Sequence, residues 1–304
     1  MFGSYRQPHA RDLREKGQSN MQESSVLPVT VYTPDLIRKM GWRVWPIMVG
    51  DLARSRELIW RLILRDLSVR YRQSLLGYTW ALLPPVVMVA IFAFLSRTRV
   101  LPIGETSLPY VAYALWSIGV WQLFSGCLQA CTHSLVSAGP LVTKINFPKE
   151  ALLIGALGQP VFDFLIRLIP VIIVFIWQGV VPAWQALFLP LFLVPVILLA
   201  LGVGFFLAIG NLLLRDIGNA LGLVLAFGMF LAPVLYPPPV EWPFVLINIL
   251  NPFSPLLIAT QDLIATGQLS MPGSFASGCL FSLIFFLLGW RFFHIGIRRL
   301  AERA

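Results

Sequence analysis

The sequence predicts an all-α polytopic membrane protein with six transmembrane helices, and two observations carry that prediction. Of its 304 residues, 57% are hydrophobic and only 12% are charged, whereas soluble globular chains carry about 25% charged residues. Uncharged runs of at least 24 residues recur along the chain, and about 20 apolar residues cross about 30 Å of hydrocarbon. The composition therefore disfavours a soluble enzyme and favours a chain that crosses a bilayer several times.

The N-terminal part contains no apolar core of a secretory signal. We expect residues 1–50 to form a cytosolic lead-in that is partly disordered.

Residues 51–75 have the pattern of an amphipathic helix. At 100° per residue, basic side chains fall on one stripe and apolar side chains on the opposite one, which is typical of a helix lying along a membrane surface. A helix of a soluble domain has a similar pattern, but the apolar run that follows directly favours the interface. Glu57 and Arg61 have the favourable i,i+4 order. The basic stripe contains Arg54, Arg61, Arg65 and Arg72.

Residues 76–304 are predicted to form the transmembrane domain. The spans are expected at residues 76–95, 108–130, 151–177, 184–213, 217–236 and 278–293. Between the second and third spans, residues 131–150 are polar and are interpreted as a short helix and a turn. Residues 242–261 are apolar but interrupted by Asn and Pro, so we expect a re-entrant helical hairpin before the last span, either buried in protein or lining a water-filled cavity.

Two opposite charges lie inside the third predicted span. Asp163 and Arg167 are four residues apart and therefore share a helix face. An intramembrane pair of this kind either locks helices together or serves as a gate or proton relay. The absence of further acidic or histidine partners in the predicted spans favours the locking role.

The distribution of basic residues predicts the orientation. With both termini in the cytosol, 20 Lys and Arg residues lie inside and 2 lie outside, as the positive-inside rule requires. The net charge of +9 is thereby explained by topology, so no nucleic-acid partner is expected.

The sequence contains no motif of a catalytic or nucleotide-binding site. None of the four lysines follows a glycine-rich phosphate loop. Cys127 and Cys131 share a helix face near His133, but a zinc site needs about four ligands, so small buried residues are the better interpretation and no metal is expected. No internal repeat of an inverted transporter is visible. The energy source of any transport is therefore expected in another chain.

Four segments, in order, resemble polysaccharide ABC exporter permeases, which serve O-antigen, capsule and teichoic acid export. The resemblance extends from about residue 58 to the C-terminus. The segments are RDLSVRYRQSLLGYTWALLPPVVM (65–88), LVTKINFPKE (141–150), NLLLRDIGNALG (211–222) and LNPFSPLL (250–257).

The resemblance implies a transport subunit without enzymatic activity. It implies a homodimer in the cytoplasmic membrane, joined by two copies of an ABC ATPase that binds ATP and Mg, with a lipid-linked polysaccharide crossing between the protomers. The implied residues that couple to the ATPase are Lys144, Phe147, Pro148, Lys149 and Glu150. The implied periplasmic gate contains Asn251, Pro252, Ser254 and Pro255.

Aromatic residues of the first two spans are candidates for a glycan channel, because their rings stack on sugars and their polar tips reach hydroxyls. The alternative is an aromatic belt at the membrane interface. The candidates are Tyr78, Trp80, Tyr110, Tyr113, Trp116 and Trp121. Other functions left open are export of teichoic acid or capsule, ABC transport of a lipid or drug without a glycan, and ion-coupled transport.

Overall fold

Helices account for all the regular secondary structure in the described part of the chain. The computed structural model describes residues 44–72, 79–97, 104, 106–139, 147–239, 241–242 and 245–301. The helices are α3 (Val44–Arg54), α4 (Arg56–Arg72), α5 (Thr79–Arg97), α6 (Tyr110–Ala138), α8 (Glu150–Ala156), α9 (Gly158–Trp177), η2 (Trp184–Phe188), α10 (Leu189–Leu213), α11 (Asp216–Gly228), η3 (Met229–Leu231), α12 (Val245–Leu250), α13 (Phe253–Ala265) and α14 (Pro272–Ala301). Residues 45–304 form one compact unit, and the lead-in predicted at residues 1–50 lies mostly outside the described residues.

Four helical stretches of the described chain are long and apolar enough to cross a membrane. They are Tyr110–Ala138, Glu150–Trp177, Trp184–Leu213 and Pro272–Ile297. They coincide with the second, third, fourth and sixth predicted spans. The first and fifth predicted spans fall on α5 and on Asp216–Leu231, where the apolar helical stretches are shorter. The polytopic helical class is therefore confirmed, while the number of six spans stays a prediction.

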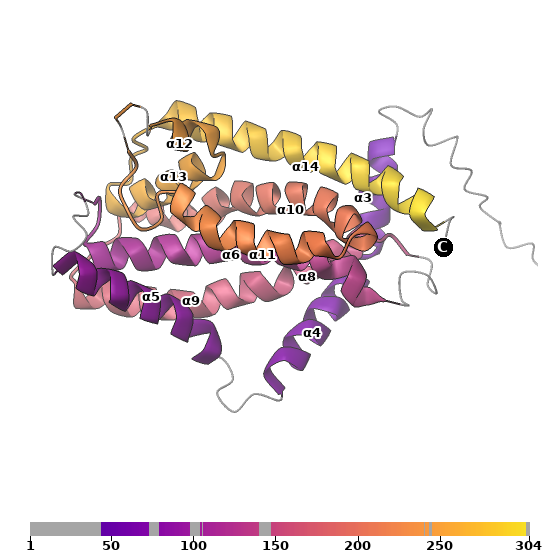
Figure 1. Ribbon diagram of the computed structural model, residues 1–304, viewed down its shortest axis with the longest axis horizontal. Coiled ribbons are helices and arrows are strands. Elements are labelled where there is room, and N and C mark those ends of the chain that lie inside the picture. Colours follow the sequence, from indigo (N-terminus) through magenta and orange to yellow (C-terminus); the bar gives the residue numbers. More distant parts are fainter. Residues whose placement is uncertain are drawn as a thin grey trace, which may run out of the picture. The chain divides into compact units, whose positions relative to one another are not determined.

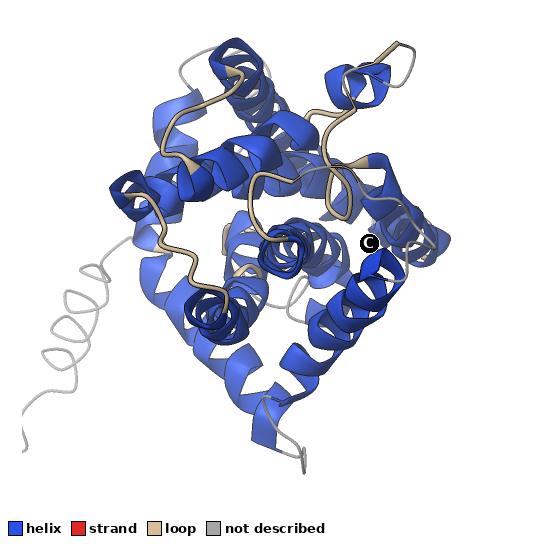
Figure 2. Ribbon diagram, turned by 90° about the vertical axis from the view of Figure 1, so that its left-hand side faces the viewer, coloured by secondary structure: helices blue, strands red, loops and turns tan. Residues whose placement is uncertain are grey.

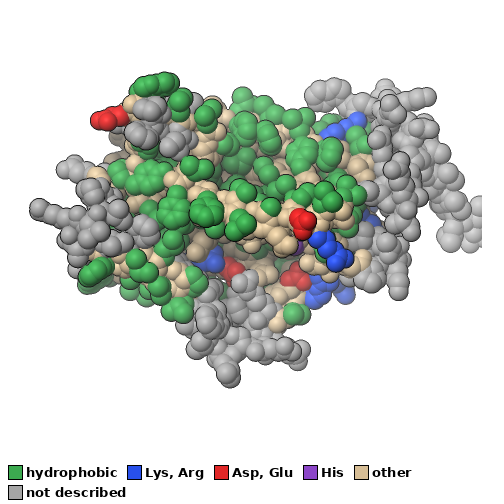
Figure 3. Space-filling view, viewed as in Figure 1, with side chains coloured by type: hydrophobic (Ala, Val, Ile, Leu, Met, Phe, Trp, Pro, Cys, Tyr) green, Lys and Arg blue, Asp and Glu red, His purple; other side chains and the backbone are tan. Residues whose placement is uncertain are grey.

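Helices α6 and α10 form the interior of the bundle, and the remaining long helices surround them (Figures 1 and 2). Within the most apolar window, 72% of α6 is buried, compared with 28% of the α8–α9 stretch. On the face shown in Figure 3, hydrophobic side chains cover α11 and much of α10 and α14, whereas most charged side chains gather toward the end where α4 and α8 lie. The exposed apolar side chains of the outer helices are those expected to contact lipid.

Small residues allow α10 to approach its neighbours closely. A Cβ atom added to Gly289 of α14 would collide with the carbonyl oxygen of Gly202 on α10, and one added to Gly204 would overlap Cys131 of α6. Close backbone contact of this kind is how membrane helices gain packing energy without a hydrophobic driving force.

The prediction of a short helix and a turn after residue 130 is wrong for residues 131–138. Helix α6 continues without a break to Ala138 and ends at Gly139, which has φ +48°. The hydroxyls of Thr132 and Ser134 donate to the carbonyls of Leu128 and Cys131 within the helix. Their polarity is satisfied internally, and after residue 130 the first glycine is Gly139, at the end of the helix.

The predicted interfacial helix is two helices in the structure. It begins earlier than expected, at Val44, and is interrupted at Ser55 between α3 and α4. The Ser55 hydroxyl donates to the Asp51 carbonyl at 2.9 Å, a local bond that competes with regular helix geometry. The predicted Glu57–Arg61 pair is confirmed, with a shortest N–O distance of 2.6 Å. Residues 73–75 lie outside the described residues.

We expect the crossing of α10 and α14 to tolerate no side chain. Gly289→Ala should lower the apparent melting temperature of the purified protein, because overpacking of this kind costs about 1–3 kcal/mol. Gly273→Ala, in the same helix but with no atom within 4 Å of the added Cβ, is the matched control. Equal melting curves for the two variants would contradict the close approach.

Candidate functional site

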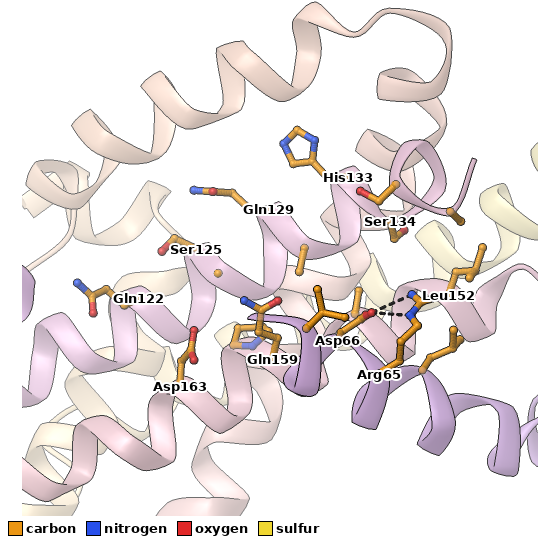
Figure 4. A pocket seen from close by; sticks show the side chains of 18 of the residues that line it. Arg65, Asp66, Gln122, Ser125, Gln129, His133, Ser134, Leu152, Gln159 and Asp163 are labelled. Atoms are coloured by element: carbon orange, nitrogen blue, oxygen red, sulfur yellow. Dashed lines mark hydrogen bonds and ion pairs between the residues drawn. The ribbon is translucent and has the colours of Figure 1, made fainter. Parts of the chain in front are cut away.

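A polar cavity lies between α4, α6, α8 and α9 (Figure 4). Its volume is about 820 Å³, within the range of about 300–1,000 Å³ that is usual for ligand sites. In Figure 4, Gln122, Ser125 and Gln129 of α6 lie across from Gln159 and Asp163 of α9. The other polar residues that line it are Arg65, Asp66, His133, Ser134, Ser137 and Arg167.

The polar residues of α6 form a stripe along one face of the helix. We define the α6 stripe as Gln122, Ser125, Gln129, His133 and Ser137, which follow one another at intervals of three or four residues. They extend over about 22 Å of helix axis at 1.5 Å per residue. The stripe was not predicted from the sequence, because its first three residues fall in the predicted apolar span and its last two in the predicted polar link. The regular spacing was the signal that would have revealed it.

Another face of α6 lines a different cavity. This second space has a volume of about 690 Å³, and its walls are almost entirely apolar. Trp121, Phe124 and Leu128 of α6 contribute to it, each next in the sequence to a stripe residue or within one turn of one. The two cavities therefore divide the surface of α6 into a polar and an apolar sector.

The charges of the polar cavity are balanced among the residues that the structure describes. Arg65 and Asp66 form an ion pair with an N–O distance of 2.8 Å. Asp163 is 4% exposed, and Arg167 lines the same cavity; neither side chain is without a partner. That Asp163 and Arg167 pair with each other stays a prediction.

The segment implied to couple to the ATPase is a compact elbow, which we define as residues 147–150. Lys149 Nζ lies 4.1 Å from the centre of the Phe147 ring, a cation–π contact. Burial lowers the pKa of Lys149, and the neighbouring Glu150 charge opposes that shift. Lys144 lies outside the described residues.

Glu150 joins the elbow to the last helix. Its Oε1 atom lies 2.6 Å from Nδ1 of His294 on α14, and the two residues are 5% and 4% exposed. Residues 144 positions apart in the sequence thus meet in a buried bond. Nothing in the sequence pattern indicates this contact, since His294 lies in an apolar helix with no partner nearby along the chain.

The elbow is also connected to α4 through α8. A Cβ atom at Gly155 would meet Leu62 of α4, and one at Gly158 would overlap Ile63. Arg54, Arg61 and Arg65 are exposed on α3 and α4. For Arg72, the structure describes the backbone alone. Helix α8 is therefore in contact with both α4 and α14.

The aromatic channel candidates of α6 pack inside the protomer. The Tyr113 hydroxyl lies 2.8 Å from the Pro233 carbonyl oxygen and 2.9 Å from that of Tyr236, and Tyr110 donates to the Leu235 carbonyl. Trp116 Nε1 donates to Thr260 Oγ1 at 3.0 Å. The two tyrosines thus bind the segment after η3, and Trp116 binds helix α13. A channel role stays a prediction for these residues.

The other three channel candidates differ in how much of them the structure describes. Trp121 is 7% exposed and makes an edge contact with the Phe253 ring, whose centre lies 5.1 Å away. Tyr78 lies outside the described residues, and for Trp80 the structure describes only the backbone of α5.

The gate candidates lie at the junction of α12 and α13. Asn251 donates to the Leu231 carbonyl and accepts from the N–H of Phe253, the first residue of α13. Pro252 is the N-cap residue of α13, and Ser254 is fully buried. Pro255 packs near Gly278 of α14. Gln261, which sequence analysis did not select, adds a bond to Ser117 Oγ at 2.8 Å.

The family of the chain is decided by a match over most of its length. Residues 57–265 match the family model described as ABC-2 type transporter. The chain belongs to the ABC-2 type transporter family. With its apolar helices, this ABC-2 transporter is a multi-pass membrane protein and a transport subunit. The elbow, α8, α9 and the cavity all lie within the matched residues.

Curated relatives of this ABC-2 transporter agree with the resemblance found in the sequence. An O-antigen export system permease protein RfbA of Klebsiella pneumoniae is 25% identical over 214 residues, which cover 68% of this chain and 79% of the relative. A protein of the same name from Myxococcus xanthus is 25% identical over 190 residues, covering 62% of this chain and 72% of the relative. The similarity to polysaccharide ABC exporter permeases is confirmed.

The Glu150–His294 bond should contribute to the stability of this ABC-2 transporter. Glu150→Ala and His294→Ala are each expected to cost about 1–3 kcal/mol, because each leaves a buried polar partner unsatisfied. The double variant should fall short of the sum, with a coupling energy of about 0.5–3 kcal/mol. Unfolding of the purified protein by SDS in mixed micelles measures all three.

The exposed Glu57–Arg61 pair provides the control for that cycle. Its side chains are 73% and 75% exposed, and removal of such pairs costs at most about 1 kcal/mol. Additive costs for Glu150→Ala and His294→Ala would show that the two residues do not interact in the folded protein.

Proposed function

We propose that this chain is the transmembrane permease subunit of an ATP-driven exporter that moves a lipid-linked, O-antigen-like polysaccharide across the cytoplasmic membrane. The observation that carries the proposal is the similarity to permeases of O-antigen export over about two thirds of the chain. A large polar cavity among otherwise apolar helices supports it, because a hydrated cargo needs polar groups within the bilayer.

The proposed topology has six spans with both termini in the cytosol. The positive-inside distribution supports this orientation, and it places α8 and the elbow at the cytosolic side. Helix α13 has 13 residues, a length of about 20 Å, which is shorter than the hydrocarbon layer of about 30 Å. Because α13 is also buried in protein, a re-entrant hairpin of α12 and α13 at the periplasmic side fits these lengths.

Two permease copies and two copies of an ABC ATPase would form the exporter. ATP and Mg would bind to the ATPase subunits, and this chain would receive their motion at the elbow. Phe147 and Lys149 would contact the ATPase, and α8 would pass the displacement to α4, α6 and α14, which it touches. Asn251, Pro252, Ser254 and Pro255 would then open or close the periplasmic exit.

Charge reversal at the elbow should uncouple ATP hydrolysis from export. In Lys149→Asp and Phe147→Asp the cation–π contact is lost and a negative charge is placed at the proposed ATPase contact. We expect the co-expressed complex to lose polysaccharide export at least about ten-fold while the ATPase subunits still hydrolyse ATP, or to lose co-purification with them. Surface polysaccharide and ATPase activity of the purified complex are the two measurements.

Gln268→Asp is the matched control for these variants. Gln268 is exposed in the loop between α13 and α14, at the opposite end of the helices, so export should remain at the level of the unchanged protein. Export by the chain without any ATPase, or unchanged export by both elbow variants, would refute the proposed function. Dependence of transport on an ion gradient and on Asp163, without ATP, would instead favour a secondary transporter.

A further inference from the structure

The α6 stripe is exceptional for a transmembrane helix, because polar side chains in the hydrocarbon layer are costly unless they face protein or water. His133 also contacts α10 and α11, through Asn211 at 3.5 Å and through Gly218, but all five side chains of the stripe line one space. They face the cavity that α4, α8 and α9 complete, whereas the adjacent Trp121, Phe124 and Leu128 line the apolar space on another face. The α6 stripe is therefore directed at one space, which calls for a polar occupant.

The chemistry of the cavity is that of amides and hydroxyls. Gln122, Gln129 and Gln159 each offer both donors and acceptors, and Ser125 and Ser137 offer hydroxyls. Sugar hydroxyls likewise donate and accept, so such a wall can bind successive sugar units without requiring one fixed orientation. The extent of the stripe, about 22 Å along the helix, exceeds the length of a single sugar ring.

The charges of the cavity disfavour an anionic occupant. Two arginines and two aspartates line it in the described residues, and Arg65 is already paired with Asp66 at 2.8 Å. A polymer with one carboxylate or phosphate on each unit would need an excess of cations here. Without that excess, each added anion would be desolvated next to Asp163 and Asp66 with no compensating charge.

We propose that this cavity binds the uncharged, hydroxyl-rich part of the exported glycan and discriminates against polyanionic sugar chains. The inference rests on the proposed function and deepens it, since it names the substrate class and the residues of contact. Gln122, Ser125 and Gln129 bind from α6, and Gln159 binds from α9. The aromatic residues of α6 hold the hairpin and make no contact with this part of the sugar chain.

Two oligosaccharides of equal length test the selectivity. Maltoheptaose is neutral, and a heptamer of galacturonic acid carries a carboxylate on every ring. Saturation-transfer NMR with the full chain in phosphatidylcholine nanodiscs should detect binding of maltoheptaose and at least about ten-fold weaker binding of the acidic heptamer. Equal or tighter binding of the acidic heptamer, or no binding of maltoheptaose, would overturn the proposal.

Variants of the stripe test the location. Gln129→Leu should weaken maltoheptaose binding about two- to ten-fold, the effect of one lost hydrogen bond, while Gln268→Leu on an exposed loop should leave it unchanged. Where Gln129→Leu is not recovered folded, Ser125→Ala removes a hydroxyl with little change in volume and should weaken binding in the same range. Unchanged binding in the recovered stripe variant would refute the location.

Failure of the cavity proposal can be distinguished from failure of the proposed function, because the two are measured separately. Oligosaccharide binding is measured without an ATPase, and ATPase coupling is measured without a defined oligosaccharide. Intact coupling with no preference for the neutral heptamer would overturn only the cavity assignment. A chain that binds no ATPase would refute the exporter, whichever heptamer it prefers.

Discussion

The requirement that polar groups inside a bilayer find partners within the protein governs the arrangement around α6. On its N-terminal half, the side chains of Tyr110, Tyr113 and Trp116 donate to the segment after η3 and to α13. The two tyrosine bonds satisfy carbonyls near three consecutive prolines, where regular helix is impossible. Toward its other end, polar side chains face a cavity. One helix thus supports an irregular element on one side and a polar space on another.

The buried bond between Glu150 and His294 has a mechanical consequence. It fixes the start of α8 to α14, while Gly155 and Gly158 allow α4 to lie against α8 and the start of α9. Because protein interiors are close-packed, elements joined this way move together rather than deform. A displacement at the elbow therefore reaches α4 and α14 at once, as the proposed coupling to a separate ATPase would require.

Local sequence determined the features that could be predicted, and tertiary contacts determined those that could not. Apolar run length predicted six spans, four of which coincide with helices long enough to cross a membrane, and i,i+4 spacing predicted the Glu57–Arg61 pair. The break at Ser55 coincides with a side-chain bond to the Asp51 carbonyl, but Ser117 and Thr132 make the same type of bond within the unbroken α6. The direction of Trp116 depends on how α6 is rotated toward α13, which its own composition does not specify. Likewise, the hydrogen bond between Glu150 and His294 joins residues 144 positions apart, and no periodic pattern in the sequence indicates it.

The cavity and the elbow share helix α8, which would connect the proposed glycan site to the proposed ATPase contact. Leu152 and Ala156 of α8 line the polar cavity, as do Gln159 and Asp163 of α9, which follows α8 after a single residue. Glu150, at the first residue of α8, belongs to the elbow. Any rotation of α8 about its contact with α14 therefore changes the distance between the α9 wall and the α6 stripe. In the proposed exporter, coupling would need no relay across the membrane, because α8, which is proposed to receive the displacement, is also a wall of the proposed glycan cavity.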